Sequence, residues 1–365
     1  RAGYDELINA IIRPPRALYG VESLGPKIFR FCDKQFSRKD FVLVNQRGLT
    51  LQCSHWEPAE RPANQLPCVV YVHGNSSARI EAVNCLAVLL GIGTTVFAFD
   101  CSGSGKSEGR YVSLGWYERE DLRVVIDHLR GSGTVSSLAV WGRSMGAVTG
   151  ILYQARDLEL LGRMSVDAMV LDSPFADFCQ LAEELVEKGK DHGLHVPKVA
   201  VRVAMHVLKG SVQKQAGFNI NDLSPVQHTK VCTVPALFIT AENDDFISPA
   251  HAEMLYETYV GAKNLVLVEG DHNSQRQGQC LNVAAGFLSK YMKLPKNWAL
   301  KESIRYACHL PWLALPGSGP HPSNPSSSFA SSEEAVPMEY GLTRERQTHI
   351  ENKVINVFGK RTKNS

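Results

Sequence analysis

Residues 138–146 read LAVWGRSMG: an apolar run of strand length, a turn, and the start of a helix-length segment at Met145. A G-x-S-x-G motif in that setting is typical of a nucleophile elbow, a sharp turn that exposes the serine hydroxyl. A bulky side chain at Gly142 or Gly146 would clash with a neighbouring strand or helix, and the serine is expected in a strained backbone conformation. The motif alone also arises by chance in glycine-bearing loops. Its strand-turn-helix setting is what predicts Ser144 as a nucleophile.

Short, nearly continuous apolar runs recur along the chain, as expected of parallel strands buried on both faces. They span 68–72, 94–99, 138–141, 168–171, 236–240 and 265–268. Helix-length segments separate most of them, at 79–90, 116–130, 145–156, 249–259 and 281–291. Ahead of them, residues 41–56 alternate around a turn-rich tetrapeptide and predict an antiparallel hairpin. This alternation predicts an α/β fold with a doubly wound, mostly parallel sheet.

The predicted domain organisation has three parts. Residues 1–36 form an N-terminal lead-in, and 37–293 form one α/β domain whose helical cap lies at about 175–235. Residues 294–365 form a C-terminal extension, expected to be largely disordered after about 316 because Pro, Ser and Gly dominate there. Truncation after about Gly317 is therefore expected to leave a folded protein with nearly unchanged turnover.

Composition narrows the classes of partner. The 365 residues include 39 basic and 37 acidic side chains. The resulting net charge of +2 does not predict binding to nucleic acid. Nine scattered cysteines without a C-x-x-C pair favour reduced thiols and an intracellular, cytoplasmic location, and they predict no metal site. No apolar run reaches 18 residues, so a soluble protein is expected, with a peripheral membrane contact left open. The chain begins at Arg1, so any targeting signal ahead of it is invisible.

Two backbone N–H groups are predicted to form an oxyanion hole, which stabilises negative charge on a substrate oxygen. Met145 opens the helix after Ser144, where its N–H has no partner inside the helix. The second donor is expected at Asn75, because the run 68–72 ends in the turn HGNS. His73 in that turn is expected to brace the loop. Asn75 also begins a glycosylation acceptor triplet, which is interpreted as coincidence.

The acid and the base are expected later in the chain, in the order nucleophile, acid, histidine. The run 236–240 is followed by the turn AENDDF, in which Asp244 is preferred as the acid over Asp245. Asp172, after an earlier strand, is a third alternative. The run 265–268 is followed by EGDHNS, which places His272 on a loop beyond the last strand and makes it the predicted base.

A second loop, DCSGSGKS at residues 100–107, ends like a phosphate-binding P-loop. It lacks the leading glycine, because Asp100 occupies that position, and no long helical run follows it directly. Nucleotide binding is therefore not expected, and the segment is interpreted as a tight loop at the carboxyl edge of the sheet.

Together the turn at 73–75, the loop at 100–107, the motif at 142–146 and GDHN at 270–273 resemble the α/β-hydrolase superfamily. The similarity covers about 41–291 and is strongest to the serine-aminopeptidase-like and monoglyceride-lipase-like branch, with a likeness to protein-depalmitoylating thioesterases. It implies a triad of Ser144, Asp244 and His272, oxyanion donors at Asn75 and Met145, and no cofactor. The sequence departs from the common pattern at Arg143, where histidine is frequent, and at Ala241, where glycine is.

The predicted activity is that of a serine hydrolase that cleaves an ester, thioester or amide bond of a small-molecule or acyl substrate through an acyl-enzyme intermediate. Aminopeptidase activity is less favoured, since such branch labels describe kinship of fold. The alternative is a non-catalytic binding or signalling protein that retains the fold. Neither the bond type, the substrate nor the oligomeric state follows from the sequence.

Overall fold

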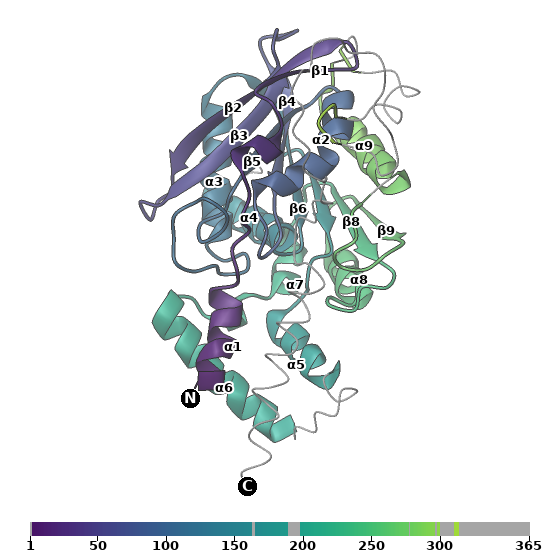
Figure 1. Cartoon of the computed structure of the whole chain (residues 1–365). Coiled ribbons are helices and arrows are strands. Elements are labelled where there is room, and N and C mark those ends of the chain that lie inside the picture. The colour runs from purple at the N-terminus through teal and green to yellow at the C-terminus, as the bar shows by residue number, and fades with distance from the viewer. Residues whose placement is uncertain are drawn as a thin grey trace.

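A computed structural model of the chain describes residues 2–162, 165–188, 198–276, 278–295, 298–299 and 310–313. Its centre is a nine-stranded sheet (Figure 1). The strands are β1 (Ile28–Phe31), β2 (Lys34–Val44), β3 (Thr50–Pro58), β4 (Leu66–Val72), β5 (Thr95–Phe99), β6 (Val135–Arg143), β7 (Ala168–Asp172), β8 (Ala236–Ala241) and β9 (Lys263–Val268).

The order of strands is β1-β2-β3-β5-β4-β6-β7-β8-β9. Pairing is antiparallel from β1 through β3 to β5 and parallel from β5 to β9, so the predicted doubly wound, mostly parallel sheet is confirmed. The expected hairpin is also present, as β2 and β3 joined by a turn between Val44 and Thr50. Its strands are longer than the alternating residues indicated, and β1 extends the sheet by one strand that the sequence did not predict.

Helices cover both faces of the sheet, which explains why its central strands are apolar throughout. The helices α2 (Val83–Gly91) and α9 (Gln279–Tyr291) pack together on one face. The helices α3 (Glu118–Gly131), α4 (Met145–Leu161) and α8 (Pro249–Thr258) contribute to the core on the other. All residues of β4, β5 and β7 are buried, as expected of strands without a solvent face.

A helical cap lies at one end of the molecule, where Figure 1 shows α1, α5 and α6 together. The cap contains α5 (Phe178–Lys188), α6 (Lys198–Ala216) and the short α7 (Pro225–His228), within the predicted boundaries of about 175–235. The side chains of Glu184 on α5 and His251 on α8 lie 3.0 Å apart and tie the cap to the body of the molecule.

The N-terminal segment is more than a lead-in. Residues Ala2–Ile12 form α1, which lies against α6, and Ile8 and Ile12 are buried in the main core. After α1 the chain runs past the cap to β1 at the far end of the sheet (Figure 1). Residues ahead of the first strand therefore belong to the same folded unit as the cap.

Two further predictions concern cysteines and the C-terminal extension. Cys32 is disulfide-bonded, so the expectation that every cysteine is a reduced thiol is wrong at this position, while seven others, six of them buried, are free. The extension after 294 lies mostly outside the described residues, of which 310–313 pack Leu310 and Trp312 against the body.

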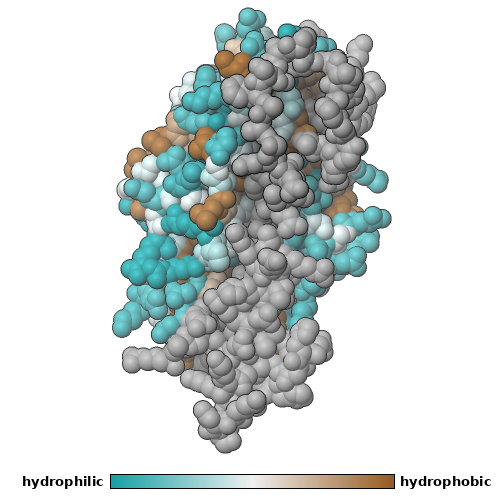
Figure 2. Space-filling view, viewed as in Figure 1, coloured by the Kyte–Doolittle hydropathy of each residue, from teal (hydrophilic) through white to brown (hydrophobic). Residues whose placement is uncertain are grey.

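The described surface carries no extended apolar area on the face shown in Figure 2, where hydrophilic residues dominate and hydrophobic ones form small separate groups. Among the described helices, none is long and apolar enough to cross a membrane.

Candidate active site

The turn between β6 and α4 is as tight as the motif predicts. Ser144 has φ 50° and ψ −114°, in a region that residues with a side chain rarely occupy. A Cβ atom added to Gly142 would lie 2.2 Å from the carbonyl oxygen of Gly146, and one added to Gly146 would lie 2.0 Å from that of Val72. Both positions therefore require glycine, because neighbouring backbone atoms lie too close to leave room for a side chain. The strained turn presents the Ser144 hydroxyl at the start of α4.

The structure brings the three predicted catalytic side chains together. Nε2 of His272 lies 3.2 Å from the hydroxyl oxygen of Ser144, and Nδ1 lies 2.7 Å from Oδ2 of Asp244. The other oxygen of Asp244 accepts hydrogen bonds from the N–H groups of Phe246 and Ile247 at 3.1 and 2.7 Å. Both carboxylate oxygens are thus committed, and His272 can turn only one nitrogen toward the serine.

The alternative acids lie elsewhere. Asp245 is exposed, whereas Asp244 is 5% exposed and His272 is 4% exposed. Asp172 is buried and ion-paired with Arg276 at 3.0 Å. Burial raises the pKa of Asp172, but the positive charges of Arg276 and Arg143 outweigh that effect and hold the pKa below its usual value.

Two arginines that the sequence reasoning left without a role hold the loop of His272. Arg143 donates to the carbonyl oxygens of His272 and Ser274 at 2.8 and 3.2 Å, and it pairs with Glu81 at 3.6 Å. Arg276 donates to the carbonyl oxygens of Asp271 and Ser274. The only signal available in the sequence was the unusual residue at position 143.

Arg143 stays charged in spite of its burial. Loss of solvent alone would lower the pKa of its guanidinium, but the carboxylates of Glu81 and Asp172 raise it above the usual value. The buried charge of Arg143 is therefore paired with carboxylates, which offsets the free-energy cost of removing it from water.

The predicted oxyanion donors flank the serine. Met145 is the first residue of α4, where helix geometry leaves its N–H without an intrahelical acceptor. Asn75 lies with Ser144 in the wall of the same cavity, on the turn after β4. The preceding residue of that turn, Gly74, donates its N–H to Glu81 at 2.8 Å. Through Glu81, the turn and the loop of His272 are connected to the same arginine.

His73 braces this turn. Its Nε2 accepts from the N–H of Cys101 at 3.0 Å, so Nδ1 carries the proton and donates to the carbonyl oxygen of Gly74 at 2.7 Å. A ring engaged on both sides is not available as a catalytic base.

The loop that resembles a P-loop is filled by a side chain of the protein. Asp100 accepts from the N–H groups of Arg79 and Lys106 at 2.7 and 2.8 Å, and from the hydroxyl of Tyr19 at 2.8 Å. The carboxylate thus takes up the N–H group of Lys106, which would otherwise be available to a phosphate.

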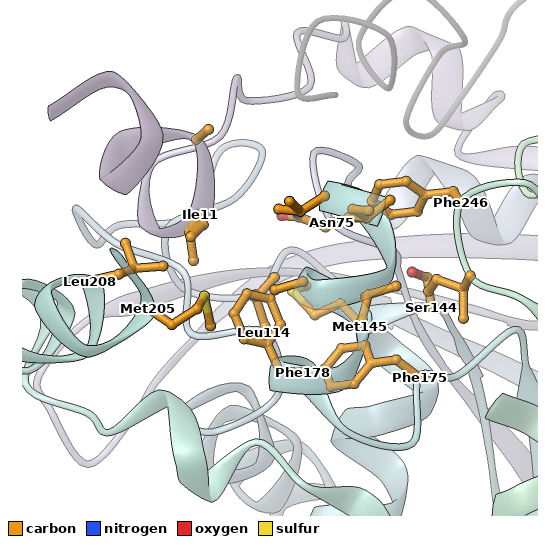
Figure 3. A pocket seen from close by; sticks show the side chains of 16 residues that line it. Ile11, Asn75, Leu114, Ser144, Met145, Phe175, Phe178, Met205, Leu208 and Phe246 are labelled. Carbon is orange, nitrogen blue, oxygen red and sulfur yellow. The ribbon is translucent and has the colours of Figure 1, made fainter. Parts of the chain in front are cut away.

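Two cavities meet at Ser144. The larger has about 870 Å³ of empty space, part of it open to solvent, and extends under the cap. Figure 3 shows Ser144 at one end of it, with Met145, Phe175 and Phe178 next along the wall. The smaller has about 320 Å³ of empty space, shares Asn75, Ser144 and Phe246 with the larger, and adds polar groups that include His272. Within the described part of the chain, no three His, Cys, Asp or Glu side chains are grouped so that they could hold a metal ion.

Comparison with known proteins gives a consistent picture. Residues 64–216 match the family described as serine aminopeptidase, S33, and 167–308 match the family of the PhoPQ-activated pathogenicity-related protein. The uncharacterized protein YqkD of Bacillus subtilis is 28% identical over 242 residues, which cover 66% of this chain and 74% of that protein. Human monoglyceride lipase is 30% identical over 135 residues, 36% of this chain and 44% of that enzyme.

Solved structures share the fold at low identity. The esterase Pf2001 of Pyrococcus furiosus superimposes with a TM-score of 0.55 and 20% identity, over 77% of this chain and 100% of that one. This likeness concerns the arrangement of strands and helices, and the chemistry must come from the site.

Proposed function

Because this chain is a member of the α/β-hydrolase superfamily, we propose that it is a serine hydrolase that cleaves an ester, thioester or amide bond through a covalent acyl-enzyme. The observation that carries the proposal is the chain of contacts from Asp244 through His272 to Ser144, at 2.7 and 3.2 Å. A binding protein that merely kept the fold would have no need of all three side chains in hydrogen-bonding reach.

The geometry supports the following first step. As the Ser144 oxygen attacks the carbonyl carbon, Nε2 of His272 takes the hydroxyl proton. Asp244 accepts from Nδ1–H, which fixes the tautomer and stabilises the imidazolium. The carbonyl oxygen becomes an oxyanion between the N–H groups of Asn75 and Met145, where donors fixed by the backbone cost little reorganisation. His272 then returns the proton to the leaving group, and the acyl group remains on Ser144.

The second step repeats this chemistry with water. His272 takes a proton from a water molecule that attacks the acyl-enzyme, and it then gives this proton to the Ser144 oxygen as the acyl group departs as a carboxylic acid. Asp244 holds the ring of His272 in this orientation, and Arg143 fixes the backbone of the same loop through the carbonyl group of His272.

The first prediction concerns the nucleophile. Ser144→Ala removes one hydroxyl group and should reduce hydrolysis of a nitrophenyl ester by at least about a thousandfold, as for loss of a triad member. It should also abolish covalent labelling by a fluorophosphonate probe, because the phosphorus atom bonds to the serine oxygen. Initial rates and gel fluorescence of the labelled protein measure the two effects.

Ser132→Ala, at an exposed position at the end of α3, is the matched control and should label like the wild type. If the Ser144→Ala protein labels as strongly as the wild type, another residue is the nucleophile. If the folded wild-type protein does not label at all, the chain is a binding protein and the proposed function is wrong.

A further inference from the structure

The larger cavity beside Ser144 is apolar over most of its wall. Among the described residues that line it, Asn75 and Ser144 are the only polar ones, and none carries a charge. A peptide with a free N-terminal amine would need an acidic partner, because an ammonium group loses its hydration on burial. An unbranched hydrocarbon chain needs no polar partner and gains free energy from burial.

The cavity has an end wall opposite the nucleophile. Figure 3 shows Ser144 at one end, and Ile11 of α1 with Met205 and Leu208 of α6 at the other. Met205 and Leu208 are buried, and α1 lies against α6. A chain that extends from an ester carbonyl at Ser144 therefore meets side chains of two helices that are far apart in the sequence.

This end wall is anchored to the body of the molecule. The carbonyl oxygen of Ile12, the last residue of α1, accepts from the N–H of Val112 at 2.9 Å. Arg16 then donates to the carbonyl oxygen of Ser107 at 2.7 Å and to that of Gly109. These contacts place α1 at a fixed position, so Ile11 is a defined boundary of the cavity.

The smaller cavity at Ser144 has a different character. The smaller cavity of about 320 Å³ is lined by Glu81, Arg143, His272 and Asn273, with a single aromatic side chain, Phe246. It is smaller than the first cavity, and its lining is mixed, with polar and charged side chains beside Phe246. The two halves of a substrate joined at the scissile bond therefore meet different surfaces, one almost wholly apolar and one that contains polar and charged side chains.

Resting on the proposed function, we propose that the substrate is an ester or thioester of an unbranched fatty acyl chain with a small polar alcohol or thiol. The acyl chain occupies the larger, apolar cavity, and the leaving group occupies the smaller one, where polar and charged side chains can contact it. Ile11, Met205 and Leu208 form the wall that limits the length of the acyl chain.

The orientation is tested with two isomers of identical composition, methyl decanoate and nonyl acetate. Both contain the same number of methylene groups, but only methyl decanoate carries its long chain on the acyl side. Each methylene that enters the cavity is worth about fourfold in kcat/KM, so four of them give more than about a hundredfold preference for methyl decanoate. Acid release measured in a pH-stat gives both rates. Equal rates, or a preference for nonyl acetate, would overturn the assignment of the cavities.

The end wall is tested with Ile11→Trp and Leu208→Trp, which project a larger side chain into the cavity. The ratio of kcat/KM for nitrophenyl decanoate to that for nitrophenyl butanoate should fall at least about tenfold, the value of two excluded methylenes. Ile11→Ala should shift the preferred chain length upward. Val207→Trp is the matched control, because Val207 lies on the same helix as Leu208 and is 47% exposed. It should keep the wild-type ratio.

The outcomes separate this inference from the proposed function. If the wild type labels with fluorophosphonate at Ser144 but hydrolyses nitrophenyl butanoate better than nitrophenyl decanoate, the proposed hydrolase activity is supported and the assignment of the apolar cavity to the acyl chain is wrong. If the preference for nitrophenyl decanoate is unchanged in both folded tryptophan variants and in Ile11→Ala, the acyl chain binds elsewhere. The assignment of the end wall is then wrong. Thermal melts of each variant establish that it is folded.

Discussion

Arg143 shows how one side chain can serve two loops of the site. It follows Gly142 in the motif, yet its guanidinium reaches the carbonyl oxygen of His272, 129 positions later, and the carboxylate of Glu81. Glu81 in turn accepts from Gly74, next to the predicted oxyanion donor. The loop of His272 and the turn at residues 73–75 therefore share one buried cation. A histidine at this position would have no second N–H pair with which to span both.

The acid pair gives a residue-scale prediction. Asp244→Asn should lower kcat for a nitrophenyl ester by about 10⁴, because the amide favours the wrong tautomer of His272 while leaving the geometry intact. Asp245→Asn removes a carboxylate that is exposed and should change kcat by less than about threefold. Steady-state rates of the two variants, one position apart, compare them directly. The opposite ranking would identify Asp245 as the acid.

Sequence alone was sufficient to select Asp244, His272 and Ser144 as candidates, because each follows an apolar run in the expected order. The roles of Arg143 and Arg276 were not predictable in this way. Their partners are carbonyl oxygens and carboxylates on other loops, and long-range pairing of that kind leaves no periodic trace in the chain. The tight choice between two neighbouring aspartates likewise depends on the path of one turn, which places Asp244 against the histidine.

At the scale of elements, the sharp turn from β6 into α4 depends on α4 lying very close to β4. The carbonyl oxygen of Val72 at the end of β4 sits where a Cβ of residue 146 would be. Four residues further along the same helix the spacing relaxes, since a Cβ at Gly150 would lie 3.4 Å from the nearest atom, a methyl carbon of Leu171. The helix therefore has one contact that tolerates no side chain and another that tolerates a small one.

This difference predicts opposite effects for two identical substitutions. Gly146→Ala must displace backbone and should lower the free energy of unfolding by at least about 2 kcal/mol. Gly150→Ala adds a methyl group at ordinary contact distance, and the gain in helix propensity should raise the free energy of unfolding by up to about 1 kcal/mol. Urea denaturation gives both values. A stable Gly146→Ala protein would mean that the turn is less tightly packed than the structure indicates.

The elements that the sequence predicted best are those buried on both sides, because their apolar runs are continuous. The elements it missed were β1 and α1. β1 has only four residues, alternately exposed and buried. α1 carries apolar residues at 8, 11 and 12, but its packing partner is α6, far away in the chain. A helix whose partner is remote gives no local sign that it belongs to the folded domain.

At the scale of the whole molecule, buried titratable groups make stability depend on pH. Burial lowers the pKa of His55 from 6.5 to about 4, and the ring also contacts Thr95 at 3.0 Å. The unfolded chain takes up a proton at His55 as the pH falls below 6.5, whereas the folded chain does so only near 4. Stability is therefore greatest above pH 6.5 and declines on acidification. Asp172 acts in the same direction at lower pH, because its pKa is held below 3.8 in the folded protein.

The predicted result is a fall in the free energy of unfolding between pH 6.5 and 4, of at most about 3 kcal/mol from the His55 pKa change alone. His55→Gln should flatten this part of the profile, since glutamine does not titrate. Urea denaturation at a series of pH values measures the slope for both proteins. Identical slopes would assign the acid sensitivity to other groups.

The contribution of α1 to the cavity has a practical consequence for anyone who prepares this protein. A recombinant chain trimmed to begin at β1 would retain Ser144, Asp244 and His272, yet one side of its substrate chamber would be open to water. Substrate screens on such a shortened preparation would measure the selectivity of a cavity that lacks one wall. A weak, unselective profile from it would say nothing about the substrate of the longer chain.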